Sequence, residues 1–342
     1  MGELQLSPVG LLLAAAMSVI NVMTDVWRKR ALEKRELFST TFWMRVAVAS
    51  LFVAIEIVQI LRGHIVMIRD TGPLFGLVHL PAGGTFAVYL VLDVSLITIV
   101  MWLYFRALQI SPLSMCIPFL AFTPVFLIPT SYILLGQKPQ PIKLLGVVLI
   151  VIGSLAMHRT LFAVGWSAPI KAVISEKGSR YMLLVALIFS LTNPLDKKLV
   201  DMSDVYVEAA SYGIGLVISF YLLARSQRAD FAAAARGNFK WIALAGTFDA
   251  VSLLFQLAAY TYLSVVITVS IKRAGIVLSV FAGWLFFRER GITDKVIAST
   301  VMFCGVLILY LPLDLTQALV FVGATLAGMT LALYRTREKQ PA

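Results

Sequence analysis

The stretch VITVSIKRAGIVLSVF, residues 266–281, places two adjacent cations, Lys272 and Arg273, inside an apolar run that extends over residues 264–287. A transmembrane helix needs roughly 20 mostly apolar residues, which this run supplies. A charge at the bilayer centre costs about 2.5–3.5 kcal/mol on insertion scales, and such residues usually face a partner or a wet cavity. The stretch therefore predicts a membrane-spanning helix that borders a polar interior.

The composition extends this prediction to the whole chain. Of 342 residues, 60% are apolar and only 14% are charged, whereas soluble domains carry about 25% charged residues. We predict an all-α polytopic membrane protein, and the net charge of +11 then reflects membrane orientation rather than nucleic-acid binding. Candidate spans lie at residues 8–27, 40–61, 84–105, 111–135, 142–158, 180–197, 204–224, 239–262, 264–287, 294–312 and 316–334.

Motifs of enzyme chemistry are missing from the sequence. The chain has two cysteines and three histidines without metal-ligand spacing, and it contains no HExxH, GxSxG or P-loop pattern. Cys116 and Cys304 lie in apolar segments, where cysteine usually packs as a small hydrophobic residue. We therefore predict no enzyme activity, no cofactor and no metal site.

Lysine and arginine are distributed unequally between the two sides of the predicted spans. One side carries 20 of these residues and the other carries six. The positive-inside rule then places the C-terminus in the cytoplasm and the N-terminus in the periplasm. This arrangement requires an odd number of spans, which residues 316–334 complete as an eleventh. Compact loops and the absence of an N-x-S/T sequon favour a bacterial inner membrane.

The chain contains an internal repeat. Residues 107–157 overlay residues 259–309 without a gap, and SVIN at 18–21 recurs as SLTN at 190–193. The overlay pairs Ala107 with Ala259, Lys143 with Lys295 and Gly153 with Gly305. Because each half holds five spans, the second half must enter the membrane upside down relative to the first. Inverted repeats of this kind are frequent in secondary transporters, with the substrate site near the midplane between the halves.

These two stretches resemble the EamA-type repeats of the drug/metabolite transporter superfamily. The resemblance rests on the AL dipeptide at 107–108, prolines within the fourth span, Glu289 in a turn, and a glycine midway through the fifth span. It implies two inverted five-helix halves around a central cavity, which move metabolites by alternating access. Gln137 departs from the pattern, because the family usually has glutamate there. We assign the repeats to residues 1–160 and 178–312, with 316–334 as an additional C-terminal segment.

Four polar residues are our candidates for binding substrate. Lys272 and Arg273 point about 100° apart on a helix, so they cannot both face one direction. Pairing of Arg273 with Asp249 is one interpretation; the other is contact of Lys272 with an anionic substrate group. Asn21 and Asn193 occupy matching positions in the two halves, where they either contact a polar ligand or bond neighbouring helices.

Three further charged residues, two aspartates and one arginine, lie inside predicted spans. Asp93 and Asp249 lie near mid-span and are our candidates for proton coupling, because a buried aspartate can take up and release a proton. Arg45 lies near the start of the second span, and we interpret it as an anchor that snorkels to the interface.

The combined prediction is a secondary transporter for a small polar, anionic or zwitterionic metabolite, acting as a monomer or homodimer among membrane lipids. One alternative is a flippase for a lipid or lipid-linked head group. Another is a non-transporting helper subunit of a cell-envelope complex, whose core would lack central polar groups.

Overall fold

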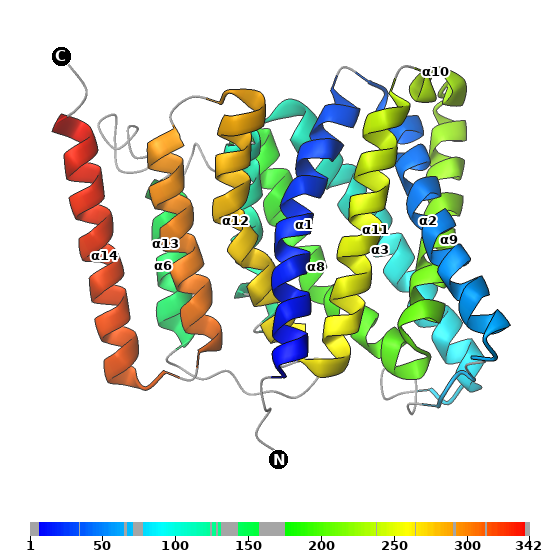
Figure 1. The fold of residues 1–342 in the computed structure, drawn as a ribbon. Helices are drawn as coiled ribbons and strands as arrows, with labels where there is room; N and C mark the ends of the chain where they lie inside the picture. Colours follow the sequence, from blue (N-terminus) through cyan, green and yellow to red (C-terminus); the bar gives the residue numbers. More distant parts are fainter. Residues whose placement is uncertain are drawn as a thin grey trace. The chain divides into compact units, whose positions relative to one another are not determined.

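The computed structural model is built from helices. It describes residues 7–33, 35–64, 67–70, 78–123, 125–127, 129–130, 143–156, 175–236, 238–263, 265–289, 292–311 and 313–338. The elements are α1 (Pro8–Leu32), α2 (Leu37–Leu61), α3 (Ala82–Ile110), α4 (Leu113–Cys116), the 3₁₀ helix η1 (Ile117–Phe122), α6 (Lys143–Ala156), α8 (Lys177–Met202), α9 (Val205–Ser226), α10 (Phe231–Ala235), α11 (Phe239–Tyr262), α12 (Val265–Phe287), α13 (Ile292–Tyr310) and α14 (Leu315–Glu338) (Figure 1). The prediction of an all-α fold is confirmed for the described residues, whereas the count of ten spans plus an eleventh stays a prediction.

Six helices in the described part of the chain are long and apolar enough to cross a membrane. They are α1, α2, α3, α9, α11 and the segment Leu315–Ala332 of α14. The predicted fourth span, 111–135, lies partly outside the described residues, and so does Gln137.

The chain divides into two compact units that do not follow the order of the sequence. Unit 1 comprises Met1–Phe105 and Leu191–Thr268, and unit 2 comprises Arg106–Ser190 and Val269–Ala342. Each unit thus takes helices from both predicted repeats, and α3, α8 and α12 contribute residues to both units.

Unit 1 is held together by pairs of long helices. Helix α1 packs along α11, and α2 packs on α9 and α11 (Figure 1). Phe86 and Tyr89 of α3 pack against Leu195, Leu199 and Met202 of α8 in one apolar cluster. Carboxylates begin several of these helices by accepting backbone N–H groups of the first turn, as N-cap residues do. They are Glu36 for α2, Asp204 for α9 and Asp230 for α10.

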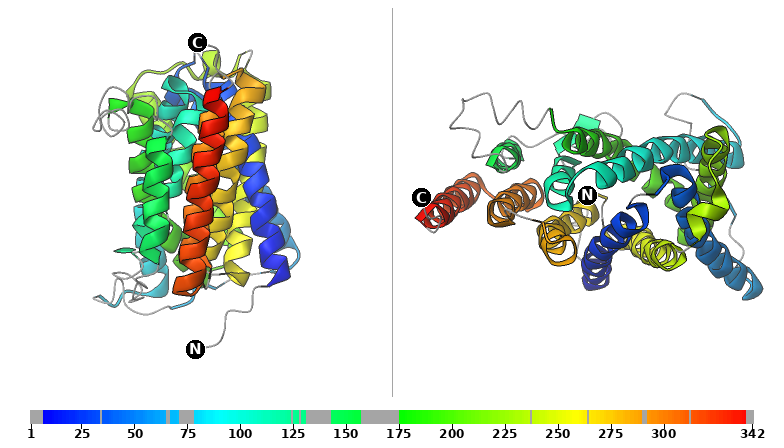
Figure 2. Two further views of the ribbon diagram at one scale, coloured as in Figure 1. Left: turned by 90° about the vertical axis from the view of Figure 1, so that its left-hand side faces the viewer. Right: turned by 90° about the horizontal axis from the view of Figure 1, so that it is seen from above.

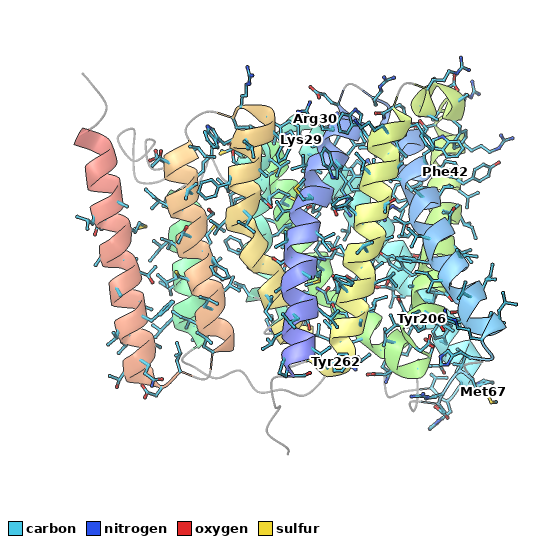
Figure 3. The ribbon with its side chains drawn as sticks, in the orientation of Figure 1. Lys29, Arg30, Phe42, Met67, Tyr206 and Tyr262 are labelled. Carbon is cyan, nitrogen blue, oxygen red and sulfur yellow. The ribbon has the colours of Figure 1, made fainter. Side chains whose placement is uncertain are left out.

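One end of unit 1 carries basic residues of α1 beside stacked aromatic rings. Lys29 and Arg30, in the last turn of α1, lie at the end opposite to Tyr206 and Tyr262 (Figure 3). At the basic end, Trp27 of α1 stacks on Trp241 of α11 with ring centroids 5.5 Å apart. The guanidinium of Arg30 lies 5.9 Å from the Trp241 ring centroid, so cation–π contacts reinforce this junction of α1 and α11.

Unit 2 is organised around the pair α6 and α13, with α14 running beside α13 (Figure 2). Gly153 of α6 lies so close to α13 that an added Cβ would come within 2.8 Å of the Ala298 carbonyl oxygen. Reciprocally, a Cβ on Gly305 of α13 would lie 2.6 Å from the Gly146 carbonyl oxygen of α6. The two glycines that the repeat overlay pairs are therefore the residues that let these helices approach closely.

Glu176 immediately precedes α8 and lies outside the membrane-spanning helices. Its carboxylate accepts hydrogen bonds from the Ser111 hydroxyl and from the backbone N–H of Ser179. Burial alone would raise the pKa of Glu176, but these hydrogen bonds outweigh burial and hold the pKa below its usual value. Glu176 therefore ionises more readily in the folded chain than in the unfolded chain.

The low pKa of Glu176 predicts a pH-dependent contribution to stability. The contribution is present above the unfolded-state pKa of about 4.3 and is lost as the pH falls through the lower folded-state pKa. We expect Glu176→Gln to lower the melting temperature of the purified protein at pH 7. The difference from wild type should shrink as the pH falls below 5. A difference that is the same at every pH would contradict the assignment.

Candidate functional site

Unit 1 contains a buried ion network centred on Asp249 of α11. One oxygen of Asp249 accepts a hydrogen bond from Arg28 Nη2 at 2.5 Å, and the other accepts from Arg45 Nη2. Arg28 also donates to Asp25 at 3.1 Å. All four side chains are buried. The network therefore contains two cations and two anions, which compensate one another in a region that excludes water.

Two aromatic rings flank the same arginine. The guanidinium carbon of Arg28 lies 5.6 Å from the ring centroid of Tyr104 and 5.4 Å from that of Phe105. Rings at this distance attract a cation by their quadrupole, and the attraction grows when water is excluded. Arg28 is thus fixed by two carboxylates and two rings, so the network has a structural role in joining α1, α2, α3 and α11.

The structure corrects our interpretation of Arg45. Its residue surface is 2% exposed, and its guanidinium pairs with Asp249. A snorkelling anchor would instead extend to the membrane surface. Asp249, which is distant in sequence, supplies the carboxylate that holds Arg45, and the local sequence around Arg45 does not reveal this partner.

Asp93 lies in a second polar region of unit 1, which differs sharply from the first. Its side chain on α3 is fully buried and faces the carboxyl groups of Asp196 on α8 and Glu208 on α9. Tyr212 of α9 interacts with Asp93 and Asp196. Asp196 and Glu208 could not be recognised as site residues from the sequence, because they fall near the ends of predicted spans, where charges ordinarily meet water.

Asn193 takes part in a hydrogen-bonded chain between helices of unit 1. Gln256 Nε2 donates to the Tyr260 hydroxyl at 2.9 Å, and that hydroxyl donates to Asn193 Oδ1 at 3.3 Å. Asn193 and Tyr260 are buried on α8 and α11. Asn21 is half-buried on α1. Asn193 thus makes a helix–helix bond, whereas ligand binding by Asn21 and Asn193 stays a prediction.

The adjacent cations Lys272 and Arg273 lie on α12 in unit 2. Arg273 is buried, and its Nη2 donates to Thr123 Oγ1 at 2.8 Å. Its guanidinium carbon lies 5.7 Å from the ring centroid of Phe189. Lys272 is half-buried. Arg273 is therefore held in a fixed orientation next to a more accessible lysine.

Glu289 has a structural role in unit 2. Its carboxylate accepts the backbone N–H groups of Leu113 and Ser114, at 2.7 and 3.0 Å, and also the Ser114 hydroxyl. Lys295 Nζ donates to the same hydroxyl at 2.8 Å. Glu289 thus satisfies the exposed N–H groups at the start of α4, which explains why a glutamate suits this turn.

Comparison with known proteins gives three findings. A family model described as the EamA-like transporter family matches residues 8–159 and 176–311. A search of curated proteins finds no match. A solved structure titled only "Crystal structure of protein" covers 86% of this chain and 95% of its own, at 13% sequence identity and a TM-score of 0.57. At that identity, the similarity concerns the fold.

Proposed function

Because this chain belongs to the EamA-like transporter family, and so to the membrane transporters of the drug/metabolite transporter superfamily, we propose that it carries a small polar, anionic or zwitterionic metabolite. Transport across a bacterial inner membrane would proceed by alternating access between two inverted five-helix repeats. Helix α14 would form an eleventh span. Its apolar segment Leu315–Ala332 is only 6% buried, as suits a helix that contacts lipid.

Helix pairing within the units supports the inverted repeats. The repeat overlay pairs α3 with α11 and α6 with α13, and the SVIN and SLTN motifs pair α1 with α8. Helix α2 then corresponds to α9 by its order within the repeat. A two-fold axis that exchanges the repeats carries α3 onto α11 and α8 onto α1. Packing of α3 on α8 therefore requires packing of α11 on α1, and both pairs occur in unit 1. The same axis exchanges α2 with α9 and α6 with α13, so the two helices of each pair can meet at the axis. Both pairs are in contact.

The observation that carries the substrate class is the pair Lys272 and Arg273 on α12, which we predict to span the membrane. The side chain of Arg273 is fixed by Thr123 and Phe189. A planar guanidinium held in one orientation suits bidentate contact with a carboxylate or phosphate. The half-buried Lys272 adds a compact charge that can follow the ligand. The basic end of unit 1, with Lys29 and Arg30, would face the cytoplasm.

Removal of either cation tests this site. A charge-assisted hydrogen bond contributes about 1.5–3 kcal/mol, so we expect Lys272→Gln and Arg273→Gln to reduce transport by about 10- to 100-fold. The substrate is first identified by comparing metabolites of deletion and overexpression cells. Uptake of that metabolite into proteoliposomes is then measured for each variant.

Lys29→Gln is the matched control, because it removes a lysine from the basic end of α1 and should transport as wild type does. Wild-type uptake by both Lys272→Gln and Arg273→Gln would disprove the site, although the transporter assignment would stand. Absence of any transported metabolite would instead count against the proposed function itself.

A further inference from the structure

Asp93 lies in an environment that a charged carboxylate does not tolerate. It is 0% exposed at the middle of α3, and neither of its oxygens receives a hydrogen bond from an N–H or O–H donor of the described residues. Glu208 is 1% exposed, and its Oε2 likewise receives none. A buried ion without hydrogen bonds carries a large desolvation cost. These two carboxyls therefore differ from Asp249, which two guanidinium groups compensate.

The group that Asp93 meets at hydrogen-bonding distance is another carboxyl, that of Asp196. Carboxylate oxygens offer only lone pairs, so two ionised carboxylates cannot form a hydrogen bond. A proton on either residue converts this contact into an O–H···O hydrogen bond and removes one of the two repelling charges. The contact between Asp93 and Asp196 thus requires a proton in order to be favourable.

A third carboxyl group and a phenol lie close to the contact between Asp93 and Asp196. Glu208 interacts with Asp93 and Asp196, and the Tyr212 phenol interacts with both aspartates. Tyr212 also lies within electrostatic range of Arg45 and Asp249 of the ion network. Within the described ranges, no group of three His, Cys, Asp or Glu residues has the arrangement to hold a metal ion. The geometry therefore favours a proton over a bound cation.

We propose that Asp93, Asp196 and Glu208 form the proton-coupling site of this transporter, with the proton bound between Asp93 and Asp196 while the site is closed to water. When the site opens, the carboxyl O–H bond breaks and the proton passes to a water molecule. The carboxylate that remains is then solvated. This proposal rests on the proposed transport function, and it assigns coupling to Asp93 rather than to Asp249.

The position of Glu208 indicates which side of the membrane lies nearer the proposed proton site. Glu208 lies in the first turn of α9, two residues beyond Tyr206. Tyr206 lies at the end of unit 1 opposite to Lys29 and Arg30 (Figure 3). The site therefore lies nearer the end that the proposed orientation assigns to the periplasm, and we expect it to exchange its proton with that side in the outward-open state and with the cytoplasm in the inward-open state.

Infrared spectroscopy tests the bound proton without any substrate. A protonated carboxyl has a carbonyl stretching band, separate from that of carboxylate, which shifts when deuterium oxide replaces water. We expect this band in the full-length purified protein in lipid at pH 7. It should be lost in Asp93→Asn or Asp196→Asn, and Asp201→Asn, which breaks only an exposed pair with Lys197, should keep it. Absence of the band from wild-type protein, or its retention in both of the first two variants, would overturn the proposal.

A second measurement connects the proton to transport. Liposomes loaded with a pH-sensitive dye report whether the metabolite identified above moves protons in wild-type protein. In Asp93→Asn, metabolite exchange should persist while the accompanying pH change is lost. A pH change of wild-type size in Asp93→Asn would overturn the coupling role. Lack of transport in wild-type protein would count against the proposed function, and the infrared result would be unaffected.

Discussion

Asparagine in place of Asp249 is expected to destabilise the protein by about 3–5 kcal/mol, the usual cost of breaking a buried ion pair by removing one partner. Arg28 and Arg45 both donate to this carboxylate, and both are buried. Without Asp249, Asp25 alone would compensate two guanidinium groups. The measurement is the fraction of purified protein that stays folded and monodisperse on heating in detergent, compared with wild type.

Two further variants separate charge imbalance from other effects. Asp201→Asn breaks the exposed pair with Lys197, and such a pair contributes at most about 1 kcal/mol. The double variant Asp249→Asn with Arg45→Gln removes one charge of each sign and leaves the Arg28–Asp25 pair in place. It should be more stable than Asp249→Asn alone. If the double variant is the less stable of the two, charge compensation does not explain the network.

Valine in place of Gly305 is expected to separate α6 from α13 and to abolish accumulation of folded protein. A Cβ at this position would lie 2.6 Å from the Gly146 carbonyl oxygen and 2.9 Å from the Ile150 backbone nitrogen. These are backbone atoms, so no rotamer change can relieve the clash, and the helices must move. Overpacking typically costs about 1–3 kcal/mol even where side chains can adjust. Membrane yield and thermal stability measure the effect.

Gly328→Ala provides the matched control in the same unit. Gly328 lies on α14, where an added Cβ would have no atom within 4 Å. The substitution should change stability by no more than about 1 kcal/mol, the difference in helix propensity between the two residues. If Gly305→Val behaved like Gly328→Ala, the close contact of α6 and α13 would not exist in the membrane.

The helical fold class and the family were predictable from the sequence because both depend on local patterns. Apolar runs of membrane length are visible without tertiary information, and the family match to residues 8–159 and 176–311 confirms the resemblance found in residues 107–157 and 259–309. The division into units was not predicted, because each unit combines segments that are distant in the chain.

The buried ion network escaped prediction because the first span was predicted to end too early. Arg28 directly follows the predicted first span, residues 8–27, and therefore falls among the cations that the positive-inside rule places in the cytoplasm. Helix α1 instead continues to Leu32, so Arg28 is buried beside Asp25 and reaches Asp249. Asp25 and Arg28, three residues apart on one helical face, were the available signal.

The stacked pair Trp27 and Trp241 gives the protein an intrinsic optical reporter. Indole emission depends on the immediate surroundings of the ring, and these two rings belong to different helices, α1 and α11. If the two helices part during transport, the stack opens and the emission changes. If they stay together, the contribution of this pair to the emission of the six tryptophans stays constant throughout turnover, and α1 with α11 can be treated as one rigid piece.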